Sequence, residues 1–183
     1  LNDCKNQLDF SQLIKKYNTS KPEGEYREFL DKLFWKIKPN IKTILEIGIS
    51  YGGGLMAMRD FFENSYLWGV DIDKDTFING DRIKQCAWID QLKLKTMKSN
   101  AEIFNVKFDL IVDDGWHHPE SQINTLIAYL PYLNIGGVYI LEDIVHKQYF
   151  KYFSKIYKIL EKKGFSCEYK NFNLSQSGIA DNL

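Results

Sequence analysis

The sequence predicts an α/β fold, with a mostly parallel sheet that is doubly wound and carries helices on both faces. Three observations support this prediction. Short apolar runs that suit buried strands alternate with segments of helical periodicity. Three of these runs end in acidic residues, and another ends in a cluster of glycines. The 183 residues are enough for one domain with a substantial core.

The first 40 residues are expected to form a short helical extension ahead of the sheet. Residues 8–17 and the stretch from Tyr26 to Ile37 carry apolar side chains at helical spacing, and Pro39 ends the second helix. Residues 41–183 are expected to form the sheet-containing core. We place no domain boundary between the two parts.

Strand and helix signals alternate from residue 41 onward. Strands are predicted at Thr43–Ile47, Tyr66–Val70, Leu92–Thr96, Phe108–Val112, Val138–Leu141 and Phe165–Phe172. Helices are predicted at Leu55–Phe62, within residues 74–90, from Pro119 to Leu130, and from Tyr149 to Leu160, where Gly164 ends the last one. Alternation of this kind produces right-handed βαβ units and therefore a parallel sheet.

The bulk composition is that of an ordinary globular protein. Lysine plus arginine and aspartate plus glutamate balance at 24 each, so the total charge indicates neither a nucleic acid nor an anionic membrane as partner. The three cysteines are too widely spaced to indicate a disulfide framework or a zinc site. The sequence has no signal peptide and no apolar run long enough to span a bilayer. We therefore expect a cytoplasmic protein.

Two acidic loops are the most informative feature of the sequence. Asp113-Asp114 and then His117 follow one apolar run, and Glu142-Asp143 follow the next. Neighbouring parallel strands deliver their carboxyl ends to one edge of the sheet, where ligands bind in open α/β folds. Carboxylates that crowd together without a lysine or arginine among them repel each other. The shared crevice is therefore expected to hold a hard metal ion beside a base.

A glycine-rich loop, Glu46–Gly54, joins the first strand to the next helix. Its glycines allow a sharp turn and a close approach to a ligand. The loop matches neither the dinucleotide-binding fingerprint nor a phosphate-binding P-loop. Asp71 ends the second strand, where an acid suits the two hydroxyls of a ribose. A plain tight turn with a solvated aspartate is the alternative.

These motifs resemble those of a known family. Glu46-x-Gly48-x-x-x-Gly52-Gly53, followed by Val70-Asp71-Ile72-Asp73, resembles motif I and the second-strand acid of class I S-adenosylmethionine methyltransferases, whose fold is Rossmann-like. The wider stretch from Tyr17 to Leu183 is similar to the metal-dependent macrolide-sugar O-methyltransferases of the mycinamicin and macrocin type. The matching pieces are Thr19-Ser20-Lys21 with Tyr26, Ile44–Ser50, Gly69–Asp73, Asp113–His118 and Gly136–Asp143.

The resemblance implies one methyltransferase domain over residues 1–183 and assigns a role to each matching residue. S-adenosylmethionine would be bound by Glu46, Gly48, Tyr51, Gly52, Gly53, Asp71 and Asp113. Mg²⁺ or another hard divalent cation would be held by Asp114, Glu142 and Asp143. Asp114 and His117 would be catalytic, with His117 as the general base. The acceptor would be a hydroxyl of a sugar or a glycosylated small molecule, and a homo-oligomer is the family-based expectation. The N-terminal helices would cover the cofactor, with Lys21 and Tyr26 near it.

Other roles stay open for individual residues. Glu142-Asp143 would instead cap a helix, and His117 would instead be a surface residue. Asp113 would contact the cofactor, support another ligand or bind the metal itself. Three further residues are less defined. His118 suits a cap before Pro119, His146 suits a solvated helix start but lies near the acidic pair, and Trp116 would wall the acceptor pocket or simply pack.

The chain departs from the macrolide-sugar group at three places. Trp116 stands where a small residue, usually serine, is common. Residues Lys95–Asn100, next to the expected third strand, lack the acid that often contacts the adenine side of the cofactor. The large N-terminal domain of those enzymes has no counterpart in this sequence, which leaves the oligomeric state open.

Three rival functions remain. A catechol-type O-methyltransferase acting on an aromatic diol would use the same metal chemistry. A non-catalytic, cofactor-binding subunit would need only the glycine loop and Asp71. A metal-dependent hydrolase would need neither, so the glycine loop argues against that class.

Overall fold

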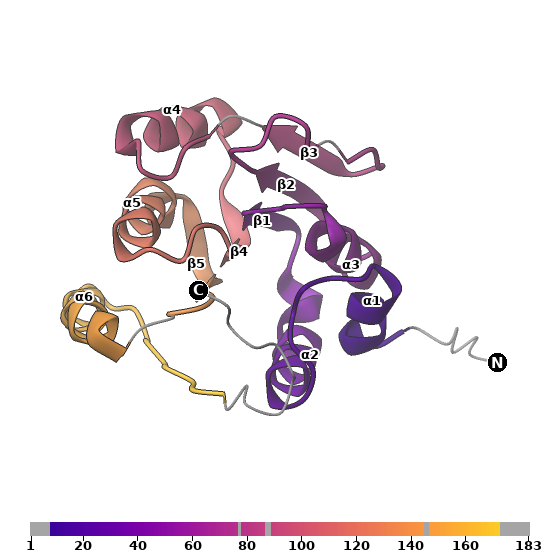
Figure 1. Cartoon of the computed structure of the whole chain (residues 1–183), viewed down its shortest axis with the longest axis horizontal. Coiled ribbons are helices and arrows are strands. Elements are labelled where there is room, and N and C mark those ends of the chain that lie inside the picture. The colour runs from indigo at the N-terminus through magenta and orange to yellow at the C-terminus, as the bar shows by residue number, and fades with distance from the viewer. Residues whose placement is uncertain (1–7, 77, 87–88, 145–146, 173–183) are drawn as a thin grey trace.

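The computed structural model describes residues 8–76, 78–86, 89–144 and 147–172. A five-stranded sheet forms its centre, in the order β3-β2-β1-β4-β5, and every strand is parallel to its neighbours (Figure 1). The strands are β1 (Thr43–Ile47), β2 (Tyr66–Val70), β3 (Ile83–Cys86), β4 (Phe108–Asp113) and β5 (Leu133–Leu141). The chain moves outward from β1 to β3 and then returns to the other side of β1. The strand order therefore reverses between β1 and β4, which is where such sheets bind ligands.

Helices cover both faces of the sheet, as the sequence predicts (Figure 1). The first face carries α1 (Phe10–Lys16), α2 (Glu25–Ile37) and α3 (Gly53–Phe61), and the second carries α4 (Leu94–Phe104) and α5 (Pro119–Tyr129). The remaining helix α6 (Phe150–Lys162) lies beyond β5 (Figure 1). Single 3₁₀ turns occupy η1 (Lys38–Asn40), η2 (Leu130–Tyr132) and η3 (Lys147–Tyr149). Within the described ranges, no helix has both the length and the apolarity that a membrane span requires.

Alternation along the strands explains the two cores. Ile44, Leu67 and Leu110 are fully buried in the core that contains α1, α2 and α3. Their neighbours in the sequence, Leu45, Trp68 and Ile111, are buried in the core that contains α4 and α5. Successive side chains of a strand point to opposite faces, so a sheet that is covered on both sides is apolar along its whole strands.

The N-terminal extension is anchored to the core. Phe10 of α1 packs edge-on against Phe34 of α2 and Phe61 of α3. At the other end of α1, the Lys16 ammonium and the Tyr17 hydroxyl both donate hydrogen bonds to Asp60 of α3. The extension is therefore part of the same folded unit as the sheet.

The third strand is not where the sequence indicates. The described residues between 74 and 90 form no helix: turns lie at residues 74–75 and 81–82, and the strand β3 follows at Ile83–Cys86. Asn79-Gly80 is a turn signal that ends any helix, and Arg82 adopts a left-handed backbone conformation just before the strand. The expected strand at Leu92–Thr96 is also wrong. The helix α4 begins at Leu94, because Met97 and Ala101 continue an apolar stripe at helical spacing.

The last predicted strand is also absent, and β5 begins earlier than expected. Residues 165–172 form no strand, because their aromatic side chains pack on helices instead. Tyr169 packs against Phe150, and Phe172 packs against Tyr26 and Phe29 of α2. The predicted strand at Val138 begins at residue 133, with an irregular register between β4 and β5.

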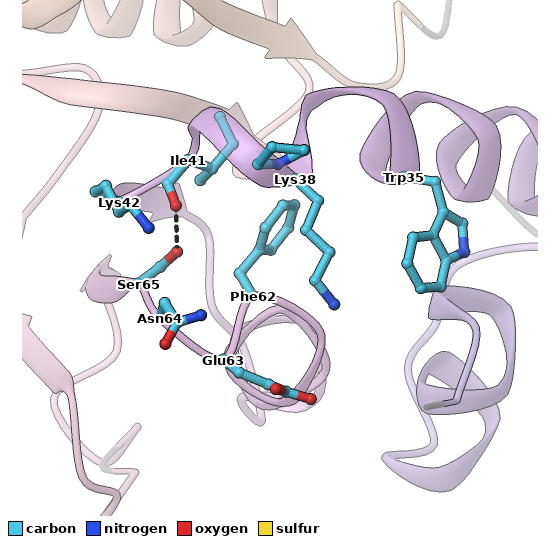
Figure 2. A pocket seen from close by; sticks show the side chains of 9 residues that line it. Trp35, Lys38, Ile41, Lys42, Phe62, Glu63, Asn64 and Ser65 are labelled. Carbon is cyan, nitrogen blue, oxygen red and sulfur yellow. Dashed lines mark hydrogen bonds between the residues drawn. The ribbon is translucent and has the colours of Figure 1, made fainter. Parts of the chain in front are cut away.

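A hollow of about 300 Å³ lies where β1 and β2 begin, at the edge opposite to their carboxyl ends (Figure 2). Ser65 donates a hydrogen bond to the carbonyl of Ile41 across its floor, at 2.8 Å. The ammonium of Lys38 lies 4.9 Å from the centre of the Trp35 ring, a cation–π distance. These are packing contacts, and the predicted site residues lie at the other edge of the sheet.

Replacement of Asp60 tests the anchor of the extension. Burial alone would raise the pKa of Asp60, but hydrogen bonds from Tyr17, Lys16 and Arg59 outweigh burial and lower that pKa from 3.8 to about 2. A pKa that is lower in the folded state contributes stability above about pH 4, and this contribution is lost as the pH falls through about 2. Asp60→Asn should therefore cost about 1–2 kcal/mol of unfolding free energy near neutral pH.

Urea unfolding of both proteins at about pH 6 and about pH 2 measures this effect. The difference between them should shrink at the lower pH. An equal difference at both values would contradict the role of Asp60.

Candidate functional site

Four strand ends stop at one level of the sheet. Ile47 at the end of β1 pairs with Val70 of β2 and with Asp113 of β4, and Asp113 pairs with Leu141 of β5. The next residue along each of these strands belongs to the predicted site: Gly48, Asp71, Asp114 and Glu142. The parallel register therefore brings the glycine loop and both acidic loops to the same edge.

Gly48 allows the glycine loop to contact the acidic loop that contains Asp114. Its backbone is left-handed, with φ of 81°. A Cβ at this position would lie 2.3 Å from the carbonyl oxygen of Asp114, so a side chain cannot fit there. Asp71 fixes the loop from the other side, because its carboxylate accepts hydrogen bonds from the amides of Ser50 and Asp73, both at 2.8 Å.

A pocket of about 480 Å³ opens between the glycine loop and the ends of β2 and β4. Of the predicted cofactor residues, Gly48, Tyr51 and Asp71 line this pocket, together with Asp114. Other predicted cofactor residues lie behind it. Gly52 contacts Ile78, Gly53 contacts Tyr17 and Thr19, and Glu46 and Asp113 are buried beneath the loops.

Glu46 is buried against the glycine loop. Only 2% of it is exposed, and within the described part of the chain its Oε2 atom has no hydrogen-bond partner. Burial raises the pKa of Glu46 to about 8, and the charge of Lys21 opposes this rise. A Cβ on Gly54 would lie 2.3 Å from the Glu46 carboxylate, so this glycine makes room for it.

Asp90 and Gln91 also line the pocket, and neither was predicted from the sequence. Both residues follow β3, and they were missed because the third strand was expected too late in the sequence. The sequence signal that could have identified them is an acid followed by an amide, a few residues after a short strand. Lys95–Asn100 lies in α4, and the acid that lines the pocket after β3 is Asp90.

Gln91 connects the pocket to the acidic loop. Its amide nitrogen donates to Asp113 at 3.0 Å and to Thr125 at 2.8 Å, and its amide oxygen accepts from the backbone of Trp116 at 2.7 Å. Burial raises the pKa of Asp113 to about 7, although the hydrogen bond from Gln91 acts in the opposite direction. Asp113 therefore holds the loop in place from below and does not line the pocket.

Lys21 lies in the middle of the acidic cluster. Its ammonium donates hydrogen bonds to Asp114 and to both carboxylate oxygens of Glu142, all at 2.8 Å. Burial alone would lower the pKa of Lys21, but the charges of Glu142, Asp114 and Glu46 outweigh it and raise that pKa. The expectation that no lysine lies among these carboxylates is wrong. The lysine comes from the N-terminal extension, 93 positions before Asp114.

A second group of side chains could hold a metal ion. Ligand atoms of Asp114, His117 and Asp143 all lie within 4.8 Å of one another. His117 Nε2 is 3.7 Å from Asp143, and its Nδ1 is buried without a hydrogen-bond partner among the described residues. Gln122 of α5 holds this loop by donating to the carbonyls of Glu142 and Asp143.

The carboxylates of Asp114 and Asp143 fit a hard divalent cation, because carboxylate oxygens are its preferred ligands, and His117 beside them stays available as a base. Asp143 has a left-handed backbone, with φ of 53°, which turns it away from the course of β5. Of the predicted ligands, Glu142 differs from the others because both of its oxygens are occupied by Lys21.

Trp116 lies at the mouth of the pocket. It is 58% exposed and lines the pocket beside Asp114. Its ring stacks on His118, with 5.4 Å between the ring centres. His118 stands at the N-cap of α5 before Pro119, as expected, although its side chain makes no capping hydrogen bond. His146 lies outside the described residues.

A parallel sheet of this strand order, with a glycine loop after β1, an acid after β2 and a pocket at the carboxyl edge, is the Rossmann-like methyltransferase fold. The predicted fold class is therefore confirmed, with the corrections to β3 and to the C-terminal segment given above.

No protein-family model matches the chain. Demethylmacrocin O-methyltransferase of Streptomyces fradiae is 29% identical over 146 residues, which cover 74% of this chain and 36% of that enzyme. Mycinamicin VI 2''-O-methyltransferase of Micromonospora griseorubida is 28% identical over the same shares. The MycE methyltransferase from the mycinamycin biosynthetic pathway, solved with Mg, SAH and mycinamycin VI, matches with a TM-score of 0.67 at 26% identity, over 75% of this chain and 40% of that one.

The chain thus spans about a third of the length of the curated relatives it matches. These comparisons confirm the resemblance to macrolide-sugar O-methyltransferases that the motifs indicate.

Replacement of Gly48 tests whether the close approach of the two loops requires glycine. Gly136 is a matched control, since its φ of 79° is nearly the same but a Cβ there would meet no atom within 4 Å. Gly136→Ala should cost about 1–2 kcal/mol for its backbone conformation alone. Gly48→Ala should cost at least about 2 kcal/mol more, because backbone atoms must move. Urea unfolding measures both, and equal losses would show that contact with Asp114 is unimportant.

Proposed function

We propose that the chain carries an S-adenosylmethionine-dependent O-methyltransferase, which methylates a hydroxyl of a sugar or glycosylated small molecule with the help of Mg²⁺ or another hard divalent cation. One observation carries this proposal: the pocket over the glycine loop and the group of Asp114, His117 and Asp143 share Asp114. The named activities of the relatives and the Mg and SAH complex of MycE support it.

The cofactor would lie in the pocket beside Gly48, with its ribose at Asp71. Each carboxylate oxygen of Asp71 already accepts one backbone hydrogen bond, and each can accept a further one from a ribose hydroxyl. Asp90, after β3, lines the same pocket and would bind the nucleoside beyond the ribose. Tyr51 is fully exposed at the rim, where it can close over a bound ligand.

Methyl transfer requires that the acceptor hydroxyl is oriented toward the methyl group and that it loses its proton. The acceptor oxygen attacks the methyl carbon of the sulfonium, so that an O–CH₃ bond forms as the S–CH₃ bond breaks and S-adenosylhomocysteine leaves. The proton of the hydroxyl passes to a ring nitrogen of His117, and Asp143 at 3.7 Å stabilises the resulting positive charge. A bound divalent cation would lower the pKa of the hydroxyl and orient it.

Asp114 connects the two halves of the site. It lines the cofactor pocket and also belongs to the group that can hold a metal ion. A residue in this position would place the acceptor hydroxyl next to the methyl group, and positioning of this kind supplies a large part of the rate enhancement.

The site residues and the relatives fit the rival functions less well than the proposed one. A non-catalytic, cofactor-binding subunit would need only the glycine loop and Asp71, and the adjoining group of Asp114, His117 and Asp143 favours catalysis over that alternative. A catechol-type enzyme would use the same residues, but the activities for which the relatives are named favour a sugar. The exposed ring of Trp116 offers a flat apolar face on the acceptor side of the pocket. A homo-oligomer remains a family-based expectation.

Substitution of the base and of Asp114 tests the proposed mechanism. His117→Ala and Asp114→Asn should each lower methyl transfer at least about 100-fold, because proton transfer or orientation is lost. Neither should abolish the binding of S-adenosylhomocysteine. His118→Ala is the matched control and should keep most of the activity, since His118 lies next to the base but stacks on Trp116.

The assay is transfer of a radiolabelled methyl group to a panel of nucleotide sugars and glycosides in the presence of Mg²⁺. Near-normal rates in both the His117 and the Asp114 variants would rule this mechanism out.

A further inference from the structure

We propose that Lys21 is a built-in cation, which occupies the acidic cluster in the metal-free protein and competes with a divalent cation for Asp114 and Glu142. This inference rests on the proposed function, because it concerns the same carboxylates. It adds a residue of the N-terminal extension to the site, and it makes cation entry depend on the movement of that extension.

The contacts of Glu142 are the first support. Both of its carboxylate oxygens accept hydrogen bonds from Lys21 at 2.8 Å, and its side chain is only 5% exposed. A magnesium ion needs an oxygen at about 2.0–2.1 Å and carries two positive charges. An ammonium and a metal ion cannot both sit that close to the same buried carboxylate without strong repulsion. Glu142 can therefore serve the metal only after Lys21 has left.

The sharing of Asp114 is the second support. Asp114 accepts a hydrogen bond from Lys21 at 2.8 Å, and it is also a member of the group with His117 and Asp143. A cation bound to that group draws on the same carboxylate that Lys21 holds. Lys21 and the cation would therefore compete for Asp114 even in a site to which Glu142 does not contribute.

Hydrogen bonds from Arg27 and to Thr19 hold the backbone of Lys21 in place. Arg27 of α2 donates two hydrogen bonds to the carbonyl of Lys21, at 3.0 and 2.6 Å. The amide of Lys21 donates to the hydroxyl of Thr19 at 3.3 Å, and only 6% of Lys21 is exposed. The backbone of Lys21 is therefore already ordered by the fold, which leaves only the side chain to be placed against the acids. This distinguishes Lys21 from a mobile surface lysine that meets an acid by chance.

The segment that carries Lys21 also touches the cofactor loop. A Cβ on Gly53 would lie 2.8 Å from the carbonyl oxygen of Tyr17 and 3.0 Å from the Thr19 side chain. Tyr17 and Thr19, just before Lys21, therefore lie directly against the start of α3. Release of Lys21 by an incoming cation would loosen this segment next to the glycine loop.

The test compares the affinity of charge-neutral variants for Mn²⁺, measured by calorimetry without cofactor. Lys21→Met removes the ammonium, and Lys21→Gln also removes the charge but keeps a hydrogen-bond donor that supports folding. Both should bind Mn²⁺ at least about tenfold more tightly than the unmodified protein. Lys15→Met is the matched control, because Lys15 is on the same extension, is 65% exposed and pairs with Glu23. Its affinity should not change.

Hydrogen exchange of residues 17–24 provides a second readout. Saturating Mn²⁺ should speed exchange in the unmodified protein and in Lys15→Met, and should change it little in Lys21→Gln. Unchanged or weaker Mn²⁺ affinity in both Lys21 variants would overturn the inference while leaving the cation site intact. Failure of every protein to bind Mn²⁺ would overturn the cation site itself, and this inference with it.

Discussion

The register of the parallel strands is the constraint on which the site depends. Ile47, Val70, Asp113 and Leu141 lie side by side at the carboxyl edge, so the residues that follow them meet there. The register is set by packing, because a slip of one residue would turn every buried side chain of a strand to the wrong face. Leu110 and Ile111 lie in opposite cores and therefore fix where Asp113 and Asp114 fall. The apolar core thus determines the geometry of a polar site.

Much of the fold was predictable because its signals are local. The runs that form β1, β2 and β4 are short and apolar on both faces, and the helices α2 and α5 show clear periodicity with proline at their ends. The edges of the sheet were not predictable in this way. The strand β3 has only four residues and depends on pairing with β2, whereas residues 165–172 alternate like a strand but find aromatic partners on helices.

Only some of the site residues could be predicted from the sequence. Residues that follow predictable strands, such as Asp71 and Asp114, fall where the sequence places them. Lys21 was expected near the cofactor from the resemblance, but its contacts with the acids were not predicted, because it lies in a loop between two helices and reaches them only through the tertiary fold. Its ammonium alters the electrostatics of the site, since it places a positive charge where mutual repulsion of carboxylates was expected. Gln91 was not predicted for a related reason, since the three hydrogen bonds of its side chain described above all join segments distant in the chain.

The central claim is that the pocket over the glycine loop binds the cofactor. A calorimetric titration of the protein with S-adenosylhomocysteine, with and without magnesium, tests this claim most directly. Binding with a dissociation constant in the micromolar range is expected, and it would justify a screen of glycosidic acceptors. An absence of binding in both conditions would contradict the claim. The glycine loop would then be a structural turn, and the acidic cluster would belong to a different chemistry.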